Sequence, residues 1–167
     1  MDDDDVAKID LAAFNEDILE EHQEKVAIIM GLFFGFRGQN EHRNLKSSHF
    51  KSGVYPPNHC LFPNCKYTAL ICIPNDKKRS LSLKSLYVRE NADELGMFPH
   101  LSDMSIDVGG ALHRYLMKLP NNTSSFQGDR DTFYCHLKVG RGGQLFFQNT
   151  YLGSTSICKL VRSATAV

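Results

Sequence analysis

The stretch FFGFRGQNEHRNLKSSHF, Phe33–Phe50, places one arginine, Arg37, between two glycines immediately after a run of large apolar residues. Gly35 and Gly38 allow a sharp change of direction, because glycine adopts backbone angles that other residues avoid. A second run with helix-forming composition, NEHRNLK, follows the turn. The stretch therefore predicts a helix, a tight turn that holds Arg37, and a second helix.

Residues before and after the turn support both helices. Upstream, apolar residues recur with the spacing of one helix face: Val26, Ile29, Met30 and Phe33. Asn15 is a suitable N-cap, with acidic residues in the first turn that follows, so the first helix is expected to run from Asn15 towards Gly35. The second helix is expected over residues 40–47, with Leu45 buried.

A β-hairpin is expected in the middle of the chain. Residues 51–66 contain three prolines and are predicted to form a loop. The apolar and β-branched run Tyr67–Ile73 predicts a strand, and the alternating run Arg79–Leu83 predicts its partner. Lys77 and Lys78 would then lie at the tip of this hairpin.

Two further helices are expected in the second half of the chain. Residues 88–106 have no regular pattern and are predicted to be irregular. Asp107 can cap a helix that ends before Pro120, with Tyr115 on its apolar stripe. The runs TFYCHLKV and GQLFF form apolar segments around GRGG. A final helix begins at about Ser154, and its apolar face continues almost to Val167, so a packing partner beyond that residue is expected.

Composition indicates a globular chain. The 167 residues are 42% hydrophobic and 23% charged, which is ordinary for a folded domain. No apolar run approaches the length of a membrane helix, and the acidic N-terminus is unlike a signal peptide. Five scattered cysteines fit a reducing compartment. We expect an intracellular protein with a disordered acidic leader, residues 1–13, before one domain, residues 14–167.

Charge is unevenly distributed, although the net charge is zero. Residues 1–30 contain ten acids and two lysines, a balance of −8, so the remaining residues carry +8. Two interpretations fit this pattern. The first is a solvated tail before an ordinary mixed surface. The second is a basic body that attracts a polyanion, together with an acidic leader that competes for the same surface.

The segment HCLFPNC brings His59, Cys60 and Cys65 close together in sequence. A structural zinc site needs four ligands, and no nearby C-x-x-C or H-x-x-x-H pair supplies the fourth. An ordinary loop with half-buried thiols is therefore favoured over a zinc-binding transcription factor. Neither a metal nor a cofactor is predicted.

An arginine in a fixed turn and a lysine on a β-hairpin suit phosphate chemistry. The planar guanidinium can hold two phosphate oxygens, and a lysine can act as a general acid. The stretch GLFFGFRGQNEHRNLKSSHF resembles the first catalytic box of the Crypton-type tyrosine recombinases. Relatives of that branch include the C-terminal domains of MYM-type zinc-finger and glutamine-rich proteins. Further segments resemble the branch in the same order, so the resemblance covers roughly residues 14–167: NDKKRSLSL, DVGGALHRYLMKLP, FYCHL, GQLFFQNTYLG and CKLVRSATAV.

The resemblance implies a role for individual residues. Arg37 would be the first catalytic arginine and would bind the scissile phosphate. Glu41 would orient that arginine through an ion pair. Lys77, with Lys78 as the alternative, would protonate the leaving 5′ oxygen. The implied fold is α+β, a mostly helical catalytic domain with a small antiparallel sheet.

The later catalytic groups of that family are not found in this sequence. No His-x-x-Arg occurs in it, and Tyr115 has the spacing of a core residue. We therefore expect a truncated or decayed DNA recombinase or integrase-like domain, its C-terminal half missing, that binds DNA backbone weakly and does not cleave DNA. The alternative is a domesticated nuclear module that binds protein or chromatin. Both place the protein in the nucleus.

Overall fold

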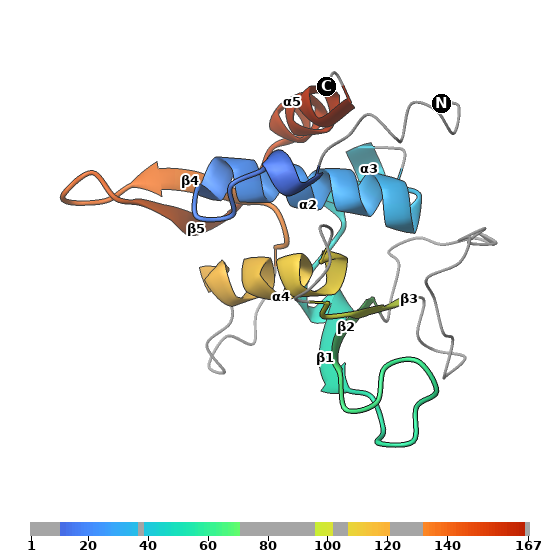
Figure 1. The fold of residues 1–167 in the computed structure, drawn as a ribbon. Coiled ribbons are helices and arrows are strands. Elements are labelled where there is room, and N and C mark those ends of the chain that lie inside the picture. The colour runs from blue at the N-terminus through green and yellow to red at the C-terminus, as the bar shows by residue number, and fades with distance from the viewer. Residues whose placement is uncertain (1–10, 37–38, 71–95, 102–106, 121–131, 166–167) are drawn as a thin grey trace.

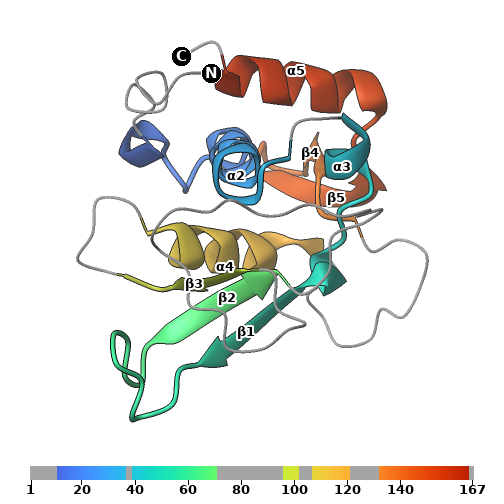
Figure 2. The same ribbon diagram turned by 90° about the vertical axis from the view of Figure 1, so that its right-hand side faces the viewer.

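The computed structural model describes residues 11–36, 39–70, 96–101, 107–120 and 132–165. Helices and two small antiparallel sheets form an α+β fold that is arranged in layers (Figure 1; Figure 2). Helix α5 (Ser154–Thr165) packs on one side of α2 (Leu19–Phe34), and α4 (Val108–Lys118) packs on the other. A three-stranded sheet covers the far side of α4, so α2 lies at the centre of the molecule.

Helix α2 has the predicted apolar face but begins later than predicted. Asn15 does not cap it, because its side-chain oxygen accepts from the backbone N–H of Asp17 at 3.0 Å and its carbonyl accepts from the N–H of Ile18 at 3.1 Å. These bonds form a separate turn before the helix. The helix ends at Gly35, which has a φ of 66°, as the glycine pattern predicted.

The hydrophobic core surrounds α2. Val26, Ile29 and Met30 are at most 1% exposed, and Phe33 packs against the same core. Complete burial of one such side chain contributes about 1.5–3 kcal/mol, so this face makes a large contribution to the stability of the fold. Tyr115 of α4 is fully buried, which confirms its prediction as a core residue.

The three-stranded sheet corrects two predictions. Its strands are β1 (Phe50–Val54), β2 (Lys66–Leu70) and β3 (Gly96–Pro99), in the antiparallel order β1-β2-β3. The predicted loop over residues 51–66 therefore contains most of β1, and the predicted irregular segment 88–106 contains β3. Both strands are short and are defined by pairing with β2, which no local sequence pattern reports.

The predicted hairpin is confirmed only in its first strand. Residues Tyr67–Leu70 are part of β2, and both edges of β2 are occupied, by β1 and by β3. The predicted partner, residues 79–83, lies outside the described residues, as do Lys77 and Lys78 at the predicted tip.

A second sheet and the last helix follow the predicted order. The apolar segments around GRGG are the strands β4 (Cys135–Val139) and β5 (Leu145–Tyr151), which form an antiparallel hairpin. Helix α5 follows directly. Its Ile157 is 1% exposed, and Leu160 packs on the core.

Two short elements differ from their predictions. Helix α3 (Gln39–Arg43) is shorter than the predicted 40–47, and a 3₁₀ turn, η2 (Ser47–His49), occupies the end of that range. The leader predicted to be disordered over 1–13 contains another 3₁₀ turn, η1 (Leu11–Ala13), because Leu11 is 2% exposed within the core. Residues 1–10 lie outside the described part.

No helix within the described residues has the length and apolar character needed to cross a membrane.

Two glycines, Gly109 and Gly110, lie in the first turn of α4, where the helix is capped and where it contacts the three-stranded sheet. Asp107 accepts a hydrogen bond from the N–H of Gly110 at 2.9 Å and caps the helix, as predicted. Gly109 lies directly against β3, where a Cβ atom would collide with the backbone carbonyls of Phe98 and Pro99. Thr68 donates to the carbonyl of Gly109 at 3.1 Å, which joins α4 to β2.

We predict that Gly109→Ala lowers the free energy of unfolding by about 2–3 kcal/mol, because the added methyl group meets backbone that cannot move aside. Gly31→Ala is the matched control. Its Cβ would have a nearest neighbour at 3.7 Å, so the substitution in the interior of α2 should raise stability by up to about 1 kcal/mol. Urea denaturation measures both, and equal effects of the two variants would contradict the close approach of α4 to β3.

Candidate functional site

The turn between α2 and α3 is fixed on its N-terminal side. Gly35 adopts the left-handed conformation, and the N–H groups of Gly35 and Phe36 both point to the carbonyl of Met30. The Phe36 ring is 3% exposed and packs edge-on against Phe34 and His42. Arg37 and Gly38 come next and lie outside the described residues. Their neighbour in sequence, Phe36, is therefore anchored in the core.

The C-terminal side of the turn is fixed by α3. His42 is 1% exposed, and its Nδ1 lies 2.9 Å from the hydroxyl of Tyr134, which precedes β4. Leu45 is buried as predicted, and its carbonyl accepts from the N–H of Phe133 at 3.3 Å. Two residues of α3 and its C-terminal extension thus bind the segment that leads into β4, although about 90 positions separate them in the sequence.

Burial keeps the groups at this contact neutral. It lowers the pKa of His42 to about 4 and raises the pKa of Tyr134 well above its ordinary value. At neutral pH, an uncharged imidazole and an uncharged phenol therefore share the hydrogen bond. No role was predicted for His42 from the sequence, although the helix predicted over 40–47 would place His42 and Leu45, three positions apart, on one face.

Glu41 occupies α3 between the turn and His42, and its side chain is partly buried. The residue is four positions after Arg37, one helical turn in sequence. Its negative charge acts on the imidazole of His42 and raises that pKa, an effect smaller than burial. The ion pair between Glu41 and Arg37 that the resemblance implies involves a residue outside the described part and stays a prediction.

Lys77 and Lys78 belong to the connection between β2 and β3. These strands pair antiparallel, with Leu70 opposite Gly96 at the end of the ladder. The connection therefore leaves and returns at the same end of the sheet. Both lysines lie outside the described residues, as Arg37 does, so their placement near Arg37 stays a prediction.

A charged cluster, which no local sequence pattern indicates, joins the residues before α2 to α4. Glu16 accepts hydrogen bonds from Arg114 at 2.6 and 3.1 Å and from Lys25 at 2.7 Å. Burial raises the pKa of the Glu16 carboxyl, but the hydrogen bonds and charges of Arg114 and Lys25 outweigh it and hold the pKa at about 2. Arg114 also binds Asp107, the cap of α4. This cluster, called the clamp below, ties the chain before α2 to both α2 and α4 and so stabilises the fold.

A buried histidine completes this clamp. His22 is fully buried, and burial lowers its pKa. Its Nε2 donates to the carbonyl of Ala111 at 3.0 Å, so its Nδ1 is free to accept from the ammonium of Lys118 at 3.0 Å. Both nitrogens serve the packing of α2 on α4. We assign no chemistry to this group.

The zinc hypothesis at HCLFPNC is not supported by the geometry. His59 accepts at Nδ1 from the N–H groups of Leu61 and Phe62, at 3.3 and 2.9 Å. The thiol of Cys65 lies within hydrogen-bond distance of the carbonyls of Lys66 and His100, and Cys60 is exposed. Across the described ranges, no three His, Cys, Asp or Glu side chains are placed to share a metal ion.

Comparison with known proteins gives no relative. No family model, no curated protein and no solved structure matches the chain.

We predict that the contact between His42 and Tyr134 makes stability depend on pH. Between pH 6.5 and 4, the unfolded chain binds a proton at His42 that the folded chain excludes, so stability falls as the pH is lowered. The loss attributable to this residue is about 2–3 kcal/mol between about pH 7 and about pH 4.5.

The variant His42→Asn isolates this contribution. The asparagine retains a polar atom near Tyr134 but cannot titrate. In urea denaturation, the variant should therefore lose about 2–3 kcal/mol less stability than the unmodified protein between about pH 7 and about pH 4.5. His136→Asn replaces an exposed histidine of β4 and should behave as the unmodified protein. A pH dependence unchanged by His42→Asn would show that this histidine is not held neutral by burial.

Proposed function

We propose that the protein is a tyrosine-recombinase-like domain that binds the DNA backbone at the turn between α2 and α3 and does not cleave DNA by itself. The observation that carries this proposal is the anchoring of the chain on both sides of Arg37. Phe36 is buried on one side, and His42 and Leu45 are buried on the other. An arginine between two such anchors can hold phosphate oxygens without a large loss of backbone entropy.

The order of elements also supports the proposal. A helix, the arginine turn and a short helix precede a three-stranded antiparallel sheet, and Lys77 lies in the connection between β2 and β3. In the recombinases that the sequence resembles, the hairpin lysine is the second group that contacts the scissile phosphate. Arg37 would bind two non-bridging oxygens, Glu41 would orient the guanidinium, and Lys77 or Lys78 would add a positive charge near the leaving oxygen.

Tyrosine chemistry is not available at the described tyrosines. Tyr55, Tyr67, Tyr115 and Tyr134 are each at most 8% exposed. Burial raises the pKa of Tyr115 and of Tyr134 well above the ordinary value, which opposes formation of a phenolate. The hydroxyl of Tyr115 lies 3.0 Å from Oε1 of Gln23 and 2.9 Å from the carbonyl oxygen of Phe133, so its one proton is used in hydrogen bonding within the core. This supports binding without a covalent intermediate.

The test of binding is the salt dependence of affinity for a short DNA duplex, measured by fluorescence anisotropy between about 50 and 200 mM salt. Arg37→Ala should weaken binding and reduce the slope of log affinity against log salt by about 0.9, the change for one phosphate contact. Lys77→Ala should act in the same direction.

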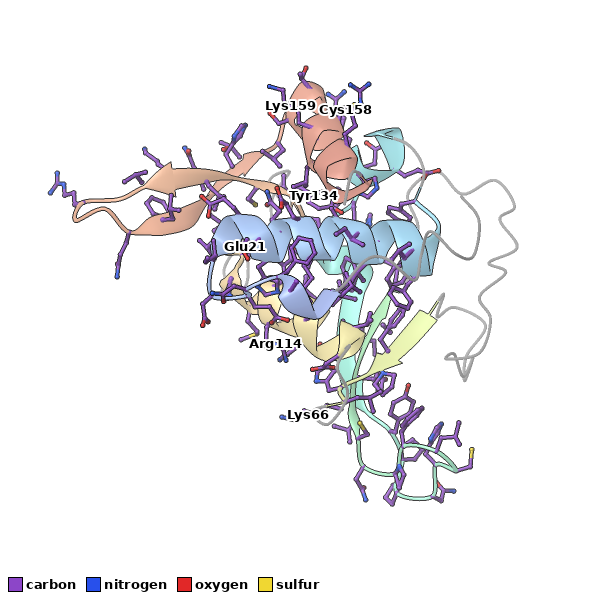
Figure 3. The ribbon with its side chains drawn as sticks, turned by 45° about the horizontal axis from the view of Figure 1, so that its top comes forward. Glu21, Lys66, Arg114, Tyr134, Cys158 and Lys159 are labelled. Atoms are coloured by element: carbon purple, nitrogen blue, oxygen red, sulfur yellow. The ribbon has the colours of Figure 1, made fainter. Side chains whose placement is uncertain are left out.

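Lys66→Ala is the matched control, because it removes an exposed cation from β2, away from the α2–α3 turn in Figure 3. It should leave the slope unchanged. If Arg37→Ala behaves like Lys66→Ala, the turn does not bind phosphate, and the alternative of a nuclear protein-binding module gains support.

A second test addresses cleavage. We expect no covalent adduct when the protein is incubated with nicked duplexes that trap a phosphotyrosine, as read on a denaturing gel. The side chains of Tyr87 and Tyr151 are outside the described set, so their phenylalanine variants are the informative controls. An adduct that either variant abolishes would overturn the non-enzymatic assignment.

A further inference from the structure

The β4–β5 hairpin projects beyond the helical layers (Figure 1). Its base is part of the core, where Cys135 and Phe147 are buried. Its outer half is exposed and apolar on both faces. Val139, 63% exposed, pairs with Leu145, 40% exposed, and on the opposite face Phe146 is 45% exposed beside Lys138. Three large apolar side chains thus remain in solvent at the end of one ribbon.

The tip of the ribbon is narrow and carries a cation. Gly142 and Gly143 have φ angles of 93° and 82°, which few other residues adopt. The N–H of Gly140 donates to the carbonyl of Gln144 at 2.7 Å, and the Phe146 ring lies over Gly140. These contacts close the turn tightly and leave the exposed Arg141 at its end.

The charged residues of the C-terminal segment, residues 132–167, are all cations. Residues 132–167 contain no aspartate or glutamate, and all 19 acidic residues lie in residues 1–131. The same 36 residues contain four cations: Lys138, Arg141, Lys159 and Arg162. Among the described residues, no carboxylate forms an ion pair with Lys138, Arg141 or Lys159. In Figure 3, Lys159 lies on the outer side of α5.

We propose that the β4–β5 hairpin is a DNA-binding arm that enters the major groove of a duplex. The major groove admits a two-stranded β-ribbon, and apolar side chains such as Phe contact thymine methyl groups there. Lys138 and Arg141 neutralise the phosphates that border the groove. The outer half of the hairpin contributes only cations, which favours a polyanion, whereas Glu21 lies at the end of α2 nearest the hairpin base (Figure 3).

The arm adds a second contact to the DNA binding proposed above, on which this inference rests. The tip of the hairpin and α3 lie at opposite ends of α2 (Figure 1; Figure 3). Helix α2 has 16 residues and a length of about 24 Å, and the hairpin extends beyond its end, so the two contacts lie further apart than about seven base pairs of a duplex. One duplex could therefore be held at the α2–α3 turn and at the hairpin.

Two variants of the full chain separate the charged and apolar contributions. Lys138→Ala with Arg141→Ala should reduce the salt slope of duplex binding by about 1.8, because two phosphate contacts are removed. Phe146→Ser should weaken binding severalfold with an unchanged slope, because it removes an uncharged contact. Lys66→Ala with Lys51→Ala removes two cations from the other sheet and is the matched control. Thermal denaturation establishes that each variant is folded.

The outcomes distinguish the arm from the turn. A smaller salt slope for the variant Lys138→Ala with Arg141→Ala, but not for the control, supports DNA binding by the hairpin. This holds whether or not Arg37→Ala has an effect. If the hairpin variant binds like the control, the hairpin is not a DNA-binding arm. The DNA binding proposed at the α2–α3 turn is then tested by Arg37→Ala alone. If the unmodified chain does not bind duplex DNA, both the arm and the turn are excluded as DNA-binding sites. That result would be expected if the apolar hairpin binds a protein partner instead.

Discussion

The fold depends on satisfying the polar side chains of a helix that is covered on both sides. Because α2 lies between α4 and α5, His22, Gln23 and Lys25 are buried in its N-terminal half. Each must find a hydrogen-bond partner, since an unpaired buried polar group costs about 1–3 kcal/mol. The partners are Ala111 and Lys118 for His22, Tyr115 for Gln23, and Glu16 for Lys25. These bonds set the position of α4 and of the chain before α2.

The same helix determines where the candidate site lies. The helix ends at Gly35, and Phe36, the residue directly before Arg37 in the sequence, is buried in the core. The contact between His42 and Tyr134 then returns the chain to the core. In the sequence, the proposed phosphate-binding arginine therefore stands between two anchored residues, and a fixed position of its flanking chain would favour the binding geometry that the proposal requires.

Local patterns in the sequence were sufficient for much of this architecture. The cap at Asp107, the buried Tyr115 and the end of α2 at Gly35 each follow from spacing or from a single residue type. Strands β1 and β3 could not be found in this way, because pairing with β2 defines them. The link between Glu16 and Arg114 joins residues 98 positions apart, and no local pattern reports such a contact.

Hydrogen–deuterium exchange of the full chain, alone and with a short DNA duplex, is the most direct test of DNA binding at the α2–α3 turn and the hairpin. We predict slower exchange on DNA binding in two separate regions, the α2–α3 turn with α3 and the outer half of the β4–β5 hairpin. Exchange in α4, whose hydrogen bonds serve only the fold, should not change. Protection confined to α4 and the three-stranded sheet, or none in the presence of saturating duplex, would contradict it.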